Sequence, residues 1–409
     1  MTAPIPPQTA RFERKREAIL ETATHLFNAR GLSGATLSDV AKGVGLTTAS
    51  VTYYYRKKED LAAACLLRAI ETLDALVSEA WAAPSPPERL TDLLARYFAR
   101  LADAAEGRAP SLITFWDLRA LTGPQAAAVM EAFLALYRRV RELFQDPSGP
   151  AFTRTEQNAR AHLVFSGLIR AQSWVERYET GDYPRAAARA ADILLNGLAG
   201  AKRRWASPSL NVALQGPGDA GEVSREAFLR AATQLVNDHG YRGASVDRIS
   251  AKLNVTKGSF YHHNETKDDL VVACFRHTFD VMRRAHDAAL AAADDGWTRL
   301  CAFAATLVRF QLSAEGPLLR VSALSATAEA LRPSLMAELR RLSAKTAGVV
   351  ADGIADGSVR AIDPVIAADL LLGLTNAAVE LDKWAPGATL ETAPDLFVKP
   401  LMTGVFAPA

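Results

Sequence analysis

Apolar residues recur at every third or fourth position along most of the chain, which is the period of an α-helix that buries one face. The spacing is clearest over residues 90–101 and again over residues 129–144. Prolines separate these runs, as expected where helices end. They are Pro84, Pro86, Pro87, Pro110, Pro124, Pro147 and Pro150. No alternating strand pattern of useful length occurs, so the sequence predicts an all-α protein.

The chain also repeats itself. Adding 209 to a residue number near the N-terminus gives its counterpart in the second half, as with Asn28 and Asn237 or Gly31 and Gly240. Residues 16–65 match their counterparts without a gap at about 18 of 50 positions, several times what chance gives. We therefore interpret the chain as a duplicated unit.

Each copy begins with a helix-turn-helix pattern. In the first copy, residues 14–30 predict a helix with one apolar face that ends at Gly31. Thr36 is expected to open a short helix, with Asp39 as its capping-box partner. A glycine-containing turn then leads to a second short helix over residues 47–54. Two short helices joined in this way form a helix-turn-helix, whose second helix enters the major groove of DNA.

The second helix begins with small and hydroxyl-bearing residues, which suit contact with base edges. A lysine at the start of the following helix is placed to hold a phosphate. In the first copy the candidate DNA-binding residues are Thr36, Thr47, Thr48, Ala49, Ser50, Thr52, Tyr53, Tyr54 and Lys58. In the second they are Ser245, Thr256, Lys257, Gly258, Ser259, Tyr261, His262, His263 and Lys267. The predicted partner is double-stranded DNA.

Residues 257–263, Lys-Gly-Ser-Phe-Tyr-His-His, together with Lys-Asp-Asp-Leu at 267–270, resemble the recognition helix of the tetracycline-repressor (TetR) family. Residues 35–41 and 244–249 are similar to the preceding helix of that family. The resemblance implies a unit with three N-terminal helices for DNA, followed by a bundle of about six helices. In the family, that bundle binds a small ligand and dimerises through its last two helices, and most members are homodimeric repressors that the ligand releases from DNA.

On this basis the chain divides into six parts. They are a tail (1–10), a first DNA-binding head (11–61), a first ligand-binding and dimerisation domain (62–205), a linker (206–222), a second head (223–270) and a second ligand-binding and dimerisation domain (271–409). The two units are expected to form an intramolecular pseudo-dimer, so that the chain works as a monomer. Its interface would be a four-helix bundle made of residues 160–178, 184–200, 365–384 and 394–405.

The two recognition helices differ in sequence, which predicts a non-palindromic operator. Thr48 and Ala49 stand opposite Lys257 and Gly258. The first copy departs from the family pattern at Thr52 and the second at Asn264. One alternative is that one head has become a dimerisation or protein-binding module. A broader alternative is a sensor that acts through protein contacts without binding DNA.

Aromatic residues of the middle helices are candidates for lining a cavity for a small, apolar effector. They are Phe98, Phe115, Trp116, Phe133, Tyr137, Phe165 and Trp174 in the first copy, and Phe303 and Phe310 in the second. Asp117 and Arg119 are candidates for a polar contact, and Leu307 and Trp384 for further lining. For each of these residues the alternative is a purely structural place in the core of the bundle.

Composition narrows the class of protein further. The net charge is only +2, so DNA binding must come from local basic clusters. The three cysteines have no metal-ligand spacing, and a surface site for His277 beside a core thiol, Cys274, is favoured over a metal site. No nucleotide-binding or catalytic motif occurs, so we expect neither an enzyme nor a cofactor. The most apolar stretch, residues 370–379, falls short of the roughly twenty residues that span a bilayer. These features favour a cytoplasmic protein without a membrane anchor.

Overall fold

The computed structural model describes residues 7–115, 118, 121, 123–146, 149–210, 225–256, 258, 266–327 and 330–408. Within these ranges the chain is helical, and the β-structure is limited to one isolated antiparallel bridge between Ala199 and Val359. The predicted all-α class is confirmed. Each unit provides helix-turn-helix elements followed by a helical bundle, as the repeat predicts.

The elements of the two units follow one another in the same order. The first unit comprises α1 (Pro7–Gly34), α2 (Leu37–Gly43), α3 (Thr48–Tyr54), α4 (Lys58–Ala80), α5 (Pro86–Ala105), α6 (Gln125–Arg141), η2 (Glu142–Phe144), α7 (Arg154–Val175), η3 (Thr180–Asp182) and α8 (Tyr183–Asn196). The second comprises α9 (Arg225–Gly243), α10 (Val246–Leu253), α12 (Lys267–Ala292), α13 (Gly296–Leu312), η4 (Val321–Ala326), α14 (Arg332–Ala355), α15 (Pro364–Ala377), η5 (Ala378–Glu380), α16 (Leu381–Trp384), η6 (Pro394–Val398) and α17 (Lys399–Thr403).

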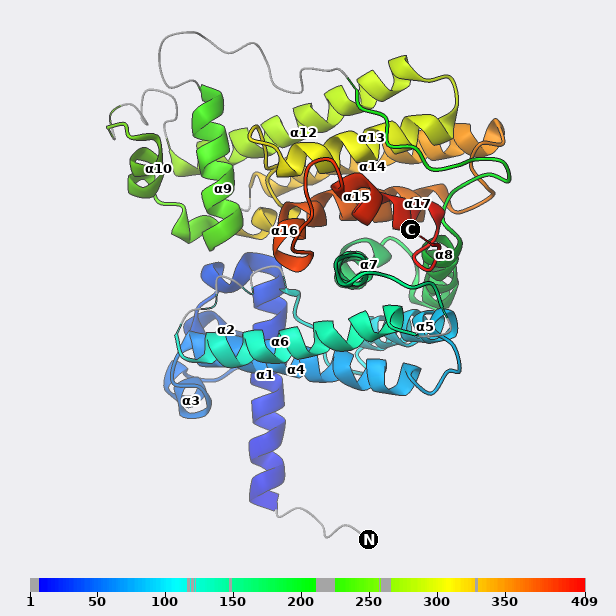
Figure 1. Cartoon of the computed structure of the whole chain (residues 1–409). Coiled ribbons are helices and arrows are strands. Elements are labelled where there is room, and N and C mark those ends of the chain that lie inside the picture. The colour runs from blue at the N-terminus through cyan, green and yellow to red at the C-terminus, as the bar shows by residue number, and fades with distance from the viewer. Residues whose placement is uncertain are drawn as a thin grey trace.

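The elements form three tiers. In Figure 1, α4, α5 and α6 of the first unit lie at the bottom, and α12, α13 and α14 of the second unit lie at the top. The last helices of both units, α7 and α8 with α15 and α17, lie between these bundles. The head elements α2 and α3 lie on the same side of the molecule as α9 and α10.

The predicted helix boundaries are largely confirmed in the first head and in α10 of the second, whereas the second recognition helix lies mostly outside the described residues. The Thr36 hydroxyl accepts from the Asp39 amide, and the Asp39 carboxylate accepts from the Thr36 amide, which completes the capping box. Gly31 and Gly240 both have φ of 70°. One detail of the prediction was wrong, because a further helical turn follows each of these breaks and carries α1 to Gly34 and α9 to Gly243.

The repeated cysteines occupy the same structural position in the two units. Cys65 donates to the Leu20 carbonyl at 3.7 Å, and Cys274 donates to the Leu229 carbonyl at 3.5 Å. Both thiols are buried, and burial raises their pKa, to about 11 for Cys65 and about 12 for Cys274. They therefore pack each first helix against α4 or α12 as small core residues.

One apolar core runs through both units. It contains buried residues from every α-helix of the first unit and also residues of α13, α14, α15 and η6 from the second. Helix α7 packs against α15 and η6, and α8 packs against α15 and α17. The predicted contact between the last helices of the two copies is thus present. Three ion pairs flank it: Arg177–Asp369 at 2.8 Å, Arg189–Asp363 at 2.5 Å and Arg360–Asp192 at 2.7 Å.

Backbone hydrogen bonds also join the units where α8 ends. The Leu198 amide donates to the Met402 carbonyl at 2.8 Å, and the Val405 amide donates to the Leu194 carbonyl at 2.8 Å. On the other side, the Arg360 amide donates to the Leu198 carbonyl at 3.0 Å. Main-chain bonds of this kind fix the relative register of the two units, because they tolerate little displacement.

The start of the predicted linker lies along the second unit. Arg309 donates to the carbonyls of Ser207 and Pro208 at 2.9 and 3.1 Å, and the Trp297 indole donates to the Arg204 carbonyl at 3.1 Å. These contacts hold the chain against α13 as it leaves the first unit. The remainder of the linker, residues 211–222, falls outside the described residues.

The apolar stretch near the C-terminus is longer than the sequence pattern indicated. Within the described residues, one helical segment, Pro364–Trp384, has 21 residues and enough hydropathy to cross a membrane by length and composition alone. However, 67% of its most apolar window is buried inside the protein. Such burial is typical of a core helix, and this segment packs on α7 at the junction of the units.

The close approach of the two units at the junction can be tested at Gly197, which ends α8 with a φ of 66°. A Cβ at this position would lie 2.3 Å from the Met402 carbonyl oxygen, so Gly197→Ala adds a backbone clash to the cost of a left-handed conformation. Gly107→Ala is the matched control, since its φ is 72° and nothing lies within 4 Å. We expect the control to lose about 1 kcal/mol of unfolding free energy in urea and Gly197→Ala more than about 3 kcal/mol. Equal losses would contradict the close approach of the two units.

Candidate DNA-binding heads and effector cavity

Helix α3 presents the predicted contact residues of the first head to solvent. Thr47 caps the helix by accepting from the Ser50 amide at 3.2 Å, and Val51 is fully buried beneath it. Thr48 and Ala49 are exposed on the opposite side, and the Tyr53 side chain is 76% exposed. The buried valine anchors α3 in the head while the predicted base-facing positions remain open to a ligand as large as DNA.

The turn between the two short helices requires a left-handed residue in each copy. Gly45 supplies it in the first head with φ of 67°, and Asn254 supplies it in the second with φ of 54°. Asparagine is one of the few residues other than glycine that adopts this conformation routinely. The turn therefore keeps the same backbone shape although its residue differs between the copies.

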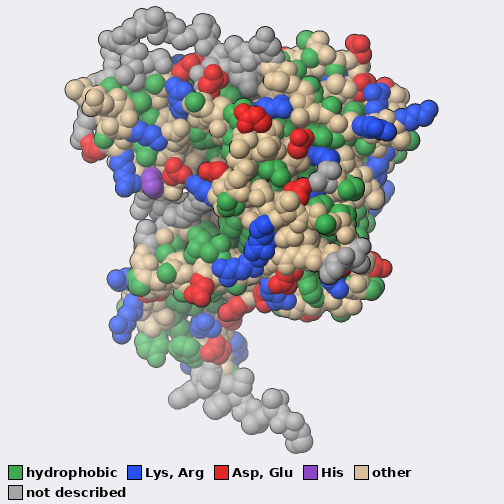
Figure 2. Space-filling view, viewed as in Figure 1, with side chains coloured by type: hydrophobic (Ala, Val, Ile, Leu, Met, Phe, Trp, Pro, Cys, Tyr) green, Lys and Arg blue, Asp and Glu red, His purple; other side chains and the backbone are tan. Residues whose placement is uncertain are grey.

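An exposed aromatic cluster on the first head was not predicted. Phe12 of α1 lies 4.7 Å from Tyr54 and 6.3 Å from Tyr53, measured between ring centroids. Hydrophobic side chains gather at this corner of the molecule over α3, beside Lys and Arg (Figure 2). Tyr53 and Tyr54 were expected to contact DNA, but Phe12 was missed because it precedes the repeated segment. Its signal in the sequence is a lone aromatic within the basic run of residues 11–16.

The second head is described only in part. Ser245 caps α10 by accepting from the Arg248 amide at 3.3 Å, as predicted, and Thr256 and Gly258 are exposed. The predicted residues Lys257, Ser259, Tyr261, His262 and His263, and also Asn264, lie outside the described residues.

The two predicted phosphate-binding lysines have different surroundings. Lys58 is the first residue of α4, and its side chain is partly exposed. Lys267 is the first residue of α12, and its ammonium lies 3.9 Å from the centre of the Tyr241 ring and donates to the Tyr241 carbonyl. In the second head, α9 therefore already holds in place the lysine that is predicted to bind a phosphate.

A repeated asparagine ties each head to the bundle behind it. The Asn28 amide donates to the Leu112 carbonyl at 2.9 Å, and its oxygen accepts from the Thr114 amide at 2.8 Å. In the second unit, Asn237 does the same with the Leu318 carbonyl at 2.9 Å and the Arg320 amide at 3.0 Å. We call these paired bonds the asparagine clamps. They hold the segment after α5 or α13 against the end of each head's first helix.

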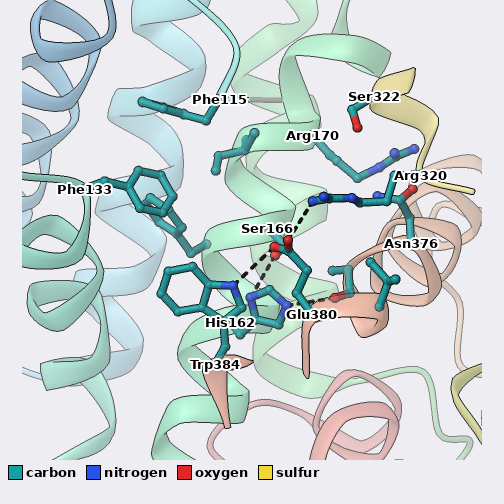
Figure 3. A pocket seen from close by; sticks show the side chains of 14 residues that line it. Phe115, Phe133, His162, Ser166, Arg170, Arg320, Ser322, Asn376, Glu380 and Trp384 are labelled. Atoms are coloured by element: carbon teal, nitrogen blue, oxygen red, sulfur yellow. Dashed lines mark hydrogen bonds and ion pairs between the residues drawn. The ribbon is translucent and has the colours of Figure 1, made fainter. Parts of the chain in front are cut away.

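A cavity of about 120 Å³ lies between the two units. We call it the aromatic cavity, because Phe115, Phe133 and Trp384 lie toward one end (Figure 3), and Phe165 also lines it. Its other lining residues are His162, Ser166, Ile169, Arg170, Arg320, Ser322, Asn376, Ala377, Val379 and Glu380. The lining thus combines α6 and α7 of the first unit with η4, α15 and α16 of the second.

Hydrogen bonds and ring contacts order this cavity. Glu380 pairs with Arg320 at 2.7 Å and accepts from the Trp384 indole at 3.3 Å. His162 lies against the Trp384 ring, with centroids 5.8 Å apart, and its Nε2 lies 3.0 Å from the Ala377 carbonyl oxygen. Because each of these side chains is held by a neighbour, the cavity has a preformed shape.

A second cavity, of about 520 Å³, occupies the corresponding place on the other side of α7 and α15. We call it the arginine cavity. It is lined by Arg170, Ser173, Trp174, Glu176, Arg177, Val321, Leu324, Met336, Leu339, Arg340, Ser343, Asp369 and Leu372. In the bundles, corresponding residues of the two copies are 206 positions apart, as Gly167 and Gly373 are. On that offset Phe115 and Phe133 of the aromatic cavity correspond to Val321 and Leu339 here.

The predicted effector-binding residues separate into four groups. Phe115, Phe133 and Phe165 line the aromatic cavity, and Tyr137 lies behind it with its ring 4.4 Å from Trp384. Trp174 lines the arginine cavity. Four of the predicted residues are buried in the core and line neither cavity: Phe98, Phe303, Leu307 and Phe310. Trp116, Asp117 and Arg119 lie outside the described residues.

Charged residues at the junction were not expected at these positions. Arg170 lies between the two cavities and lines both. Burial lowers the pKa of its guanidinium, and the Asp369 charge opposes that shift. Burial raises the pKa of Asp369, while the ion pair with Arg177 opposes it. Sequence periodicity alone does not find such residues, because they lie on a helix face that looks polar until the second unit covers it.

Arg320 connects the aromatic cavity directly to the second head. Its guanidinium pairs with Glu380 in the cavity and donates to the Asn237 carbonyl at the end of α9. The following turn, η4, packs against both α9 and α1, and Arg332 donates to the Ala29 carbonyl of α1 at 2.5 Å. The segment from Arg320 to Arg332 thus contacts the first helices of both heads.

These features define a tandem helix-turn-helix protein with a helical bundle behind each head. The model for bacterial regulatory proteins of the tetR family matches residues 19–65 and 228–274, which keep the 209-residue offset of the repeat. The chain therefore carries two copies of the DNA-binding segment that this family model describes.

Curated relatives share this segment. The chain is 35% identical over 75 residues to the transposon Tn10 TetC protein of Escherichia coli, which is 18% of this chain and 38% of the relative. It is 31% identical over 67 residues to the negative transcriptional regulator IcaR of Staphylococcus epidermidis, covering 15% and 36%. It is 34% identical over 59 residues to the transcriptional repressor AcnR of Corynebacterium glutamicum, covering 14% and 31%. The matches therefore span between 31% and 38% of each relative's length.

Two solved structures each match a little under half of this chain. AibR, in complex with isovaleryl coenzyme A and operator DNA, is 23% identical with a TM-score of 0.37, covering 45% of this chain and 99% of that one. A TetR-family regulator from Bordetella parapertussis is 20% identical with a TM-score of 0.38, covering 44% and 94%.

The asparagine clamps can be tested in isolation. Asn28→Ala and Asn237→Ala each leave a backbone carbonyl and amide without their partners, which costs about 1–3 kcal/mol where these groups are buried. We expect amide hydrogen exchange at Thr114 in the first variant, and at Arg320 in the second, to speed up at least about tenfold. Asn196→Ala is the control, because its exposed amide bonds only to the Asp192 carboxylate. Unchanged exchange in both clamp variants would show that the clamps do not hold these segments.

Proposed function

We propose that this protein is a ligand-responsive DNA-binding transcriptional regulator, most simply a repressor, in which one chain supplies both DNA-reading heads. The observation that carries this proposal is the presence of two tetR-family DNA-binding segments in one chain whose bundles share a buried junction. A homodimeric regulator obtains its second head from another copy. Here the second head is covalently attached, so the chain binds its operator as a monomer.

The placement of the heads supports joint binding. Both lie on the same side of the molecule, as a single stretch of duplex would require (Figure 1). Two recognition helices fit successive major grooves when they are about 34–36 Å apart. The main-chain bonds at the junction limit how far the bundles behind the heads can shift, and so restrict the spacing of the heads.

The operator is non-palindromic in this proposal. Position 49 is alanine and its counterpart, position 258, is glycine; position 48 is threonine and its counterpart, position 257, is lysine. A threonine methyl and hydroxyl favour different base edges from a lysine ammonium, which prefers guanine. The Phe12, Tyr53 and Tyr54 cluster adds an aromatic surface to the first head.

An effector would act through the segments that the asparagine clamps hold. The aromatic cavity is lined by Phe115 next to one clamp and by Arg320 within the other. A ligand that favours one position of these segments shifts the equilibrium between head spacings, because it binds the two arrangements with different free energies. Release from the operator follows if the favoured spacing no longer fits successive grooves.

A matched pair of substitutions tests the contribution of each head. Ala49→Glu and Gly258→Glu place one carboxylate at corresponding, exposed positions of the two recognition helices. Repulsion from DNA phosphate is expected to weaken operator binding at least about tenfold in each case, with loss of footprint over a different half-site. Ala188→Glu is the control, since this exposed residue lies on α8, away from the heads.

The outcomes separate the alternatives. If only one of the two variants loses affinity, the other head does not read DNA, and its role lies in pairing or protein contact. If the unmodified chain binds no duplex even at low salt, where phosphate contacts are strongest, regulation by DNA binding is wrong.

A further inference from the structure

The two ends of the aromatic cavity have opposite chemistry. Phe133 and Trp384 lie at one end, while Arg170, Arg320, Ser322 and Asn376 lie at the other (Figure 3). A ligand that fills this space therefore meets aromatic rings with one part and cationic or hydrogen-bonding groups with the other. This arrangement suits a molecule with an apolar body and a polar head.

In the part of the chain that the structure describes, Arg170 is the cation at this end that forms no ion pair, although the Asp369 charge acts on it from the other side. Arg320 is paired with Glu380 at 2.7 Å, and the nearby Arg177 is paired with Asp369 at 2.8 Å. Among the described residues, the Arg170 guanidinium has no hydrogen-bond or ion-pair partner, and its Nε is buried from solvent. A buried cation without a partner is costly, so an anion placed beside it gains more than it would at an exposed arginine.

The size of the cavity limits the apolar body. Its volume of about 120 Å³ is close to that of cavities that accept a benzene ring, about 150 Å³. A single ring, or a short branched chain of similar volume, fills this space against Phe115, Phe133 and Trp384.

The two sides of the pseudo-dimer are not equivalent in this respect. In the arginine cavity, Val321 and Leu339 replace Phe115 and Phe133, and the ion pair of Arg177 with Asp369 occupies the wall. Among the described residues, the phenylalanine pair lines the aromatic cavity and has no counterpart in the arginine cavity, which predicts one ligand per chain.

We propose that the aromatic cavity binds one small monocarboxylic acid with a single-ring or similarly small branched body, and that Arg170 is its anchoring cation. The carboxylate lies beside the Arg170 guanidinium, within reach of Ser322 and Asn376, and the ring packs against the contacting pair of Phe133 and Trp384. This inference rests on the proposed function only for its consequence at the operator, because the binding itself requires no DNA.

Isothermal titration of the full chain with phenylacetate and with phenylacetamide tests the chemistry of the site. The two probes have the same ring and differ in charge. We expect one phenylacetate per chain and at least about tenfold weaker binding of the amide, which lacks the charge that Arg170 compensates. Equal binding of both probes would overturn the proposal. So would the absence of heat from phenylacetate at about 5 mM, a concentration at which a Kd of about 1 mM is measurable.

Substitutions locate the site. Arg170→Gln should weaken phenylacetate at least about tenfold and leave the amide nearly unchanged, whereas Arg340→Gln, in the arginine cavity, should change neither. Ile169→Phe, which fills the aromatic cavity alone, should abolish binding of the acid, and Leu339→Phe on the other side should not. The reverse pattern would place the ligand in the arginine cavity and contradict the proposal. If Arg170→Gln does not fold, as judged by circular dichroism, the two filling variants and the acid–amide comparison still decide.

Measuring operator binding with and without phenylacetate separates the proposed ligand site from the proposed function in DNA binding. If phenylacetate binds in the aromatic cavity but leaves DNA affinity unchanged, the ligand site stands and its coupling to the heads is wrong. If the chain binds DNA but neither probe binds, DNA binding stands and the carboxylate site is wrong.

Discussion

The structure depends on one constraint: the last helices of the two units must bury the same apolar surface against each other. Helix α7 packs on α15 and η6, and α8 packs on α15 and α17, so the core of the first bundle continues across the junction into the second. The second unit also has an apolar core of its own behind its head. Charged groups at this junction are held in defined places, as Arg160 is by the carbonyl of Val405 at 3.0 Å and by the Phe152 ring. Because the two units belong to one chain, this association does not depend on protein concentration. Two heads that would separate from a dissociating homodimer therefore stay together.

Residues that hold the scaffold together are the same in the two copies, whereas residues that face outward differ. Asn28 and Asn237 make the same two bonds, and Cys65 and Cys274 donate to equivalent carbonyls. By contrast, the exposed positions of the recognition helices and the walls of the two cavities differ between the copies. A duplicated homodimer is free to diverge in this way, since each substitution affects only one side. The same freedom lets η4 of the second unit contact both α1 and α9, so that one segment lies between the cavity and both heads.

Local signals in the sequence predicted the heads well. Three features of the heads depend on residues that are close in the sequence: the Thr36 capping box, the glycine breaks and the short helices. Such local interactions can be predicted from the sequence. The aromatic cavity was predicted only in part. Phe115, Phe133 and Phe165 were identified, but Arg170, Glu380 and His162 were not, because their roles arise from contact between residues 150 to more than 200 positions apart. Phe98 and Phe303 have the same helical spacing as the cavity residues and pack in the core instead, and spacing alone does not separate these outcomes.

If one chain supplies both heads, the complex with operator DNA has the mass of a single chain plus the duplex. Native mass spectrometry of the purified protein bound to a duplex with both half-sites measures the number of chains present. We expect one chain of 44.0 kDa per duplex, with both half-sites protected in a footprint of the same complex. Two chains on a single pair of half-sites would contradict it, because each chain would then contribute only one working head.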